Sequence, residues 1–128
     1  MDNINFMGYK VNKNIKYFTP NTVLFSNDAE KVTVAMVNDV LDYYINIISH
    51  QNPLIDSYQR AKKVFSALKM MLDNKQPPKQ KKEDLKLAVD VLEEIKNQSA
   101  KSTAEKDYNA RCALICKLMI DGFAGGIS

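Results

Sequence analysis

The longest apolar pattern with a helical period runs through residues 27–50. Apolar residues recur there every three or four positions, and strict alternation fails wherever two apolar residues are adjacent. Asn27 with Glu30 three residues later has the spacing of a capping box, which predicts that the helix begins near Asn27. The alternative is a strand over residues 31–37, because β-branched residues are frequent there. The helical pattern predicts these core-facing residues: Val37, Val40, Leu41, Tyr44, Ile45 and Ile48.

Three more amphipathic helices are predicted further along the chain. The first covers about residues 53–73 and begins with an asparagine cap followed by proline, a favoured first helical residue. The second covers about residues 83–96, with acidic residues in its first turn. The third covers about residues 102–121, begins with a Ser-Thr-Ala-Glu capping box and is expected to end at Gly122.

Residues 1–25 lack a helical period. Two short apolar runs, at residues 4–8 and 15–18, flank a turn signal at residues 12–14. This pattern favours a β-hairpin, and the other interpretation is an extended arm laid over the helices. Because this segment lacks the period needed to join the helices, we expect the helices to fold without residues 1–18.

These elements predict an all-α fold, or nearly so: an antiparallel bundle of about four helices with an extended or β-hairpin N-terminal segment. Residues 1–128 are expected to form a single domain, which is long enough to bury a core without disulfides. Residues 74–82 hold two prolines and four lysines, which predicts an extended, solvated linker. Residues 122–128 are predicted to form a flexible apolar tail.

The composition, 45% hydrophobic and 26% charged, is typical of a globular protein. The chain has no run of eighteen apolar residues and its first residues are polar, so we expect no membrane span, no secretory signal and a cytoplasmic location. Cys112 and Cys116 lie four residues apart on one predicted helix, which suits apolar packing in a reducing compartment better than a disulfide. Zinc needs ligands beyond these two, and the chain has one histidine, so no metal or cofactor is expected.

The sequence offers little catalytic machinery. His50 is the single histidine, and its place near a predicted helix C-terminus favours a role in stabilising that end. Phosphate-binding loops need a glycine-rich turn, and only Gly8 precedes Gly122. Carboxylates that share a helical face, such as Asp90 and Glu94, are interleaved with lysines and indicate a solvated face. We therefore expect a protein that is not an enzyme.

The net charge of +3 conceals an uneven distribution. Residues 53–82 hold eight basic and two acidic residues, whereas residues 26–52 carry a net charge of −3. The basic excess is nearly all lysine, which lacks the bidentate geometry with which arginine reads guanine. A solvated surface is the favoured interpretation, and binding to nucleic acid or to an acidic protein surface is the alternative. The candidate anion or nucleic-acid contacts are Lys62, Lys69, Lys79, Lys81 and Lys82.

Both ends of the chain carry surplus apolar residues, which often form an interface with another protein or with a second copy. We therefore expect a protein–protein interaction module, such as an adaptor, chaperone, inhibitor or accessory regulator. Abundant lysine, asparagine and isoleucine are typical of AT-rich genomes, so a bacterial, phage or virulence system is one setting for it. The alternative function is a nucleic-acid-binding regulator that uses the lysine-rich helix face and linker. The candidate interface residues are Phe6, Tyr9, Tyr17, Phe18, Phe123 and Ile127.

Overall fold

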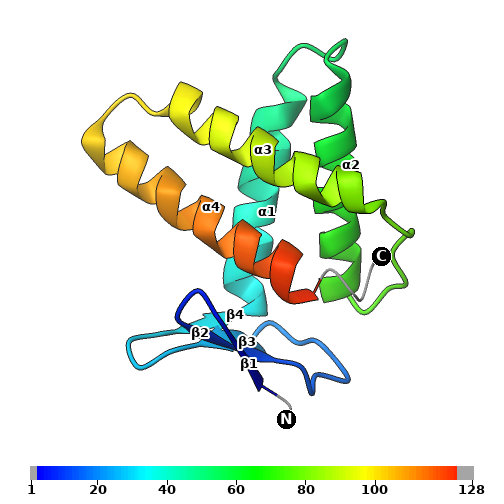
Figure 1. Ribbon diagram of the computed structural model, residues 1–128, viewed down its shortest axis with the longest axis vertical. Helices are drawn as coiled ribbons and strands as arrows, with labels where there is room; N and C mark the ends of the chain where they lie inside the picture. Colours follow the sequence, from blue (N-terminus) through cyan, green and yellow to red (C-terminus); the bar gives the residue numbers. More distant parts are fainter. Residues whose placement is uncertain (1–2, 124–128) are drawn as a thin grey trace.

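The computed structural model describes residues 3–123, apart from the side chains of residues 3–6 and 99. The described chain is mostly helical, and Figure 1 shows a small sheet below four helices. The prediction of four helices is therefore confirmed, and the N-terminal part contains more β-structure than the expected hairpin. In chain order the elements are β1 (Asn3–Phe6), β2 (Tyr9–Asn12), β3 (Val23–Ser26), β4 (Lys31–Thr33), α1 (Val34–Ser49), α2 (Asp56–Leu72), α3 (Lys82–Ser99) and α4 (Thr103–Phe123).

The sheet is an antiparallel meander with the strand order β1-β2-β3-β4. Met7 and Gly8 connect β1 to β2 with φ angles of 51° and 84°, as in the two-residue turns that fit the twist of a hairpin. A hairpin is present, but its predicted turn at residues 12–14 was wrong. Residues 13 and 14 lie beyond β2, and the Asn12 side-chain amide instead donates to the Val23 carbonyl at 3.1 Å.

Helix α1 begins at Val34, and the prediction that it begins near Asn27 was wrong. The Asn27 side-chain oxygen accepts the amides of Ala29 and Glu30, at 2.9 and 2.8 Å, within the turn between β3 and β4. An asparagine turn and a helix cap use the same acceptor and nearby amides, which explains why the sequence signal is ambiguous. Thr33 is the actual cap, and its hydroxyl accepts the Met36 amide at 3.4 Å. Of the alternative strand over residues 31–37, only residues 31–33 form a strand, which is β4.

Helices α1 and α2 form one antiparallel hairpin, and α3 and α4 form another, which crosses the first obliquely in Figure 1. Contacts join α1 to α2, α2 to α3, α3 to α4 and α4 to α1 around a shared core. Helix α2 begins at Asp56 instead of residue 53, because the Asn52 side chain accepts the Leu54 amide at 2.9 Å and holds a turn there.

The predicted end of α4 at Gly122 was wrong. Gly122 is buried inside the last turn of this helix, so it does not terminate the helix in a left-handed conformation. A Cβ atom at Gly122 would lie 3.1 Å from Cε1 of Phe25 and 3.4 Å from Cγ1 of Val11. The glycine therefore allows α4 to approach the sheet closely. The predicted tail thus begins inside α4, and residues 124–128 lie outside the described residues.

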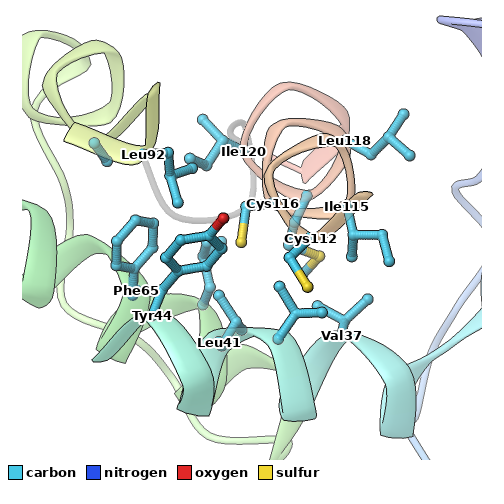
Figure 2. Packing of buried hydrophobic residues seen from close by; sticks show 14 of the residues in the cluster. Val37, Leu41, Tyr44, Phe65, Leu92, Cys112, Ile115, Cys116, Leu118 and Ile120 are labelled. Carbon is cyan, nitrogen blue, oxygen red and sulfur yellow. The ribbon is translucent and has the colours of Figure 1, made fainter. Parts of the chain in front are cut away.

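The core forms where the two helix hairpins and the sheet meet. Figure 2 shows Val37, Leu41 and Tyr44 of α1 close to residues of α4 such as Cys116. Five of the six residues predicted to face the core from α1 are buried, and Ile45 is half-buried. The Tyr44 hydroxyl donates to the Asn109 carbonyl at 3.0 Å, so this buried tyrosine is satisfied. Cys112 and Cys116 are buried free thiols.

The predicted linker connects α2 to α3 without regular structure, but it is held against the rest of the protein. Asn74 adopts a φ angle of 60° at the end of α2. Its side-chain oxygen accepts the Phe18 amide at 2.7 Å, and its side-chain nitrogen donates to the Phe18 carbonyl at 2.8 Å. The Lys75 amide donates to the Met70 carbonyl at 2.9 Å, and Pro77 is buried. These contacts return the segment alongside α2, as Figure 1 shows.

Candidate binding surface along helix α2

Residues 74–81 connect α2 to α3 and are called the returning segment below. This segment closes one side of a hollow of about 350 Å³ on the outer face of α2. Its apolar lining comes from three residues: Ala67 is buried, Met70 is half-buried, and Pro78 is exposed on the segment. The other lining residues are polar, and Lys62 and Lys63, called the lysine rim below, give them a positive charge. The residues that line the hollow are Gln59, Lys62, Lys63, Ser66, Ala67, Met70, Pro78 and Gln80.

A second hollow of about 410 Å³ lies between α1 and α2. Met70 lines both hollows, so they adjoin along α2. The second hollow has balanced charges, because Lys69 pairs with Asp42 and the Lys75 ammonium lies 3.2 Å from the Asp73 carboxylate. The residues that line it are Asn38, Asp42, Lys69, Met70, Asp73 and Lys75.

The predicted lysine set is only partly brought together. Lys62 lines the first hollow, whereas Lys69 lines the second and is neutralised by Asp42. Lys79 and Lys81 are exposed on the returning segment. Lys82 is the exposed first residue of α3. Sequence reasoning missed Lys63, which lines the first hollow beside Lys62.

The first hollow carries an uncompensated positive charge. Among residues 3–123 no ion pair involves a lysine of the set Lys62, Lys63, Lys79, Lys81 and Lys82. Arg60 is different, because its Nε donates to the Asp84 carboxylate at 2.8 Å and its guanidinium also lies 3.6 Å from Asp56. The hydrogen bonds to Asp84 raise the pKa of Arg60. The charge of Arg60 is therefore neutralised by carboxylates of the protein itself, whereas the five lysines have no such ion pair among the described residues.

The four described side chains of the candidate interface at the chain ends do not form a common exposed surface. Tyr9 is buried, and Phe18 and Phe123 are half-buried against the core. The rings of Phe123 and Phe25 are 5.6 Å apart in an edge-to-face arrangement. Tyr17 alone of the described side chains in this set is well exposed, with 69% of its surface accessible. The Phe6 side chain and Ile127 lie outside the described residues. The apolar surplus is largely used to join the sheet to the helices.

Tyr9 belongs to a polar cluster that joins β2, the β3–β4 turn and α4. Its hydroxyl donates to the Glu30 carboxylate, and Arg111 donates to the Tyr9 oxygen at 2.9 Å and pairs with Glu30. Hydrogen bonds from Arg111, and then from Tyr9, lower the pKa of Glu30. This cluster acts as a structural link. Sequence reasoning missed it because the three residues come from distant parts of the chain.

The described histidine, cysteine and carboxylate side chains bear on metal and thiol chemistry. Within the described part of the chain no group of three or more His, Cys, Asp or Glu residues is arranged to hold a metal ion. Burial raises the pKa of both the Cys112 and Cys116 thiols, which disfavours the reactive thiolate. His50 is exposed at the end of α1, where its Nδ1 lies 2.7 Å from the Asn46 carbonyl. None of the helices in residues 3–123 has the length and apolar character needed to cross a membrane.

Comparison with protein-family models, with curated proteins and with solved structures gives no match for this chain.

Proposed function

We propose that this protein is a non-enzymatic interaction module that binds another protein on the outer face of α2. The observation that carries the proposal is the first hollow, whose lining combines apolar residues with the lysine rim. Protein interfaces typically have an apolar centre that excludes water, surrounded by a polar rim. Met70 and Pro78 supply such a centre, and Lys62 and Lys63 belong to the rim.

A nucleic-acid-binding regulator is the second candidate, because Lys62 and Lys63 line the first hollow. Lys79, Lys81 and Lys82 are also exposed on, or directly after, the segment that bounds this hollow. Proteins that bind single strands combine such charge with aromatic side chains on which bases stack. The residues that line the first hollow include no aromatic side chain, and its neighbour Arg60 is paired with Asp84. The apolar lining residues are also of little use against a phosphate backbone. These features favour a protein partner.

Affinity capture from a lysate with the intact chain and two charge-reversal variants tests the proposal. The variant Lys62→Glu/Lys63→Glu reverses the rim of the first hollow. The matched control, Lys101→Glu/Lys106→Glu, reverses two exposed lysines around the start of α4, well away from α2 in Figure 1. Both variants are expected to melt like the intact chain, because the four side chains lie near or on the surface.

The expected result is a protein partner that the intact chain and the control capture and that the rim variant loses. Capture that is equal for all three chains would contradict the proposed surface. Material that nuclease digestion releases, and that only the rim variant fails to capture, would favour the second candidate.

A further inference from the structure

We infer that the element docking on α2 is a short acidic segment of the partner protein that inserts an apolar side chain beside Met70. This inference rests on the proposed function and specifies the chemistry of the partner.

The shape of the two hollows favours a partner that binds through a single helix or extended segment. Residues of α2 from Gln59 to Met70 line the first hollow, and residues 69–73 line the second. The two adjoining hollows together are called the track below. Fourteen helical residues from Gln59 to Leu72 rise about 20 Å, at about 1.5 Å per residue. The returning segment bounds one side of this track, and α1 bounds the other near Met70. A helix or an extended segment of a partner fits such a track, because its few side chains can enter the hollows in turn.

The two ends of the track differ in charge. Lys62 and Lys63 lie in the N-terminal part of α2, with Lys79 and Lys81 on the returning segment. The C-terminal part of the track has no net charge, because Lys69 pairs with Asp42 and Lys75 pairs with Asp73. We therefore place the carboxylates of the partner over the N-terminal part and its apolar side chain beside Met70. Like charges in that position would be repelled.

The cations also favour carboxylates distributed along a flexible segment. Lysine attracts an anion as a point charge on a long flexible stem, without the fixed fork of arginine. Such a rim accepts acidic residues at several positions and does not require one rigid phosphate geometry. The aliphatic stems of Lys62 and Lys63 add apolar surface to the rim.

The test uses a phage-displayed library of random peptides of about 16 residues, enough for a helix that spans the track. The intact chain selects the peptides, and each selected peptide is then titrated against the variants. We expect peptides rich in aspartate and glutamate that also contain a large apolar residue. Their affinity should fall about ten-fold for Lys62→Glu/Lys63→Glu and stay unchanged for Lys101→Glu/Lys106→Glu. It should also fall for Met70→Ala, and replacing the acidic residues of the peptide by lysine should restore binding to the rim variant.

Several other results would contradict the inference. Peptides without acidic residues that still lose affinity on Met70→Ala would overturn this inference and leave the proposed function intact. Peptides that bind all variants equally, or a library that yields no binder, would overturn the inference. A parallel titration uses a labelled single-stranded RNA of about 20 nucleotides. If the intact chain binds RNA but no peptide at this surface, and the rim variant loses the RNA binding, both proposals are overturned. Concentration-dependent self-association that the rim variant abolishes would identify a second copy as the occupant and overturn the inference.

Discussion

Met70 lines both hollows, so at the scale of single residues the binding proposal depends on it most. A methionine side chain is flexible and polarisable, and it adapts to apolar groups of different shape. That property suits a surface which receives a side chain from another protein. Lys62 and Lys63 contribute attraction over a longer range, which weakens as salt is added.

Leu41 provides a residue-scale test of the core. Its side chain is fully buried, whereas its neighbour Asp42 is exposed and pairs with Lys69. Leu41→Ala is expected to lower the free energy of unfolding by about 2–5 kcal/mol, through lost burial and a cavity. Asp42→Ala should lower it by less than about 1 kcal/mol, because solvent screens the exposed pair. Urea denaturation measures both losses, and equal values would contradict the assignment of the two faces of α1.

Gly122 provides a second residue-scale prediction. In an exposed helix interior, glycine to alanine usually stabilises a protein by about 1 kcal/mol. At Gly122 the added Cβ atom would lie 3.1 Å from Phe25 Cε1, against a buried ring of the sheet. We therefore expect Gly122→Ala to lower the free energy of unfolding by about 1–3 kcal/mol. Thermal denaturation measures the change, and a higher melting temperature would show that α4 does not pack tightly on β3.

At the scale of elements, the sequence predicts the helices well because helical periodicity is a local signal. Val37, Leu41 and Tyr44 recur at that spacing and are all buried. The strands are three or four residues long, too short for a clear alternation. The start of α1 was misplaced because Asn27 forms a turn with the same local hydrogen bonds as a helix cap.

The candidate binding surface was only partly predictable. Lys62 was identified from the charge of its segment, but the hollow beside it depends on how residues 74–80 return along α2. That return depends on Asn74, which pairs with the backbone of Phe18 across 56 residues of sequence. A local pattern contains no information on such a contact. Pro78 was read as part of a solvated linker for the same reason.

The link between the sheet and α4 predicts a dependence of stability on pH. Because Arg111 and Tyr9 lower the pKa of Glu30 from its ordinary value of 4.5, the folded state favours the charged carboxylate. The stability from Glu30 is fully present above that value and is lost as the pH falls through the lower pKa of the folded protein. Urea denaturation between about pH 7 and pH 3 measures this loss. Glu30→Gln should reduce stability at neutral pH and flatten the acid limb.

The matched control for Glu30→Gln is Asp90→Asn, which changes an exposed carboxylate in the interior of α3, away from the helix ends. It should leave the acid limb as steep as in the unaltered protein. An acid limb that Glu30→Gln leaves unchanged would show that the cluster adds little to the stability of the fold.

At the scale of the whole molecule, the sheet closes one end of the helical core. Tyr9 and Val11 of β2 are buried, and Val11 contacts the last turn of α4 near Gly122. The expectation that the helices fold without residues 1–18 assumed that this segment lies outside the core. The burial of β2 contradicts that assumption.

Deletion of residues 1–18 is now expected to destabilise the protein strongly, since it removes β1 and β2 and exposes Phe25. The measurement is the melt followed by circular dichroism, which should become broad or move to a much lower temperature. Tyr17→Ser is the control, because Tyr17 is 69% exposed and its replacement should leave the melt unchanged. A deletion variant with the same cooperative melt as the intact chain would contradict the placement of the sheet.

Hydrogen exchange of the backbone amides, with and without the captured partner, tests the central claim most directly. A partner that docks on α2 excludes solvent from the face that bears both hollows and holds the returning segment in place. We predict that the added protection is concentrated in residues 59–73 and 74–81. Protection confined to β1, β2 and the end of α4, with α2 and the returning segment unchanged, would contradict the account.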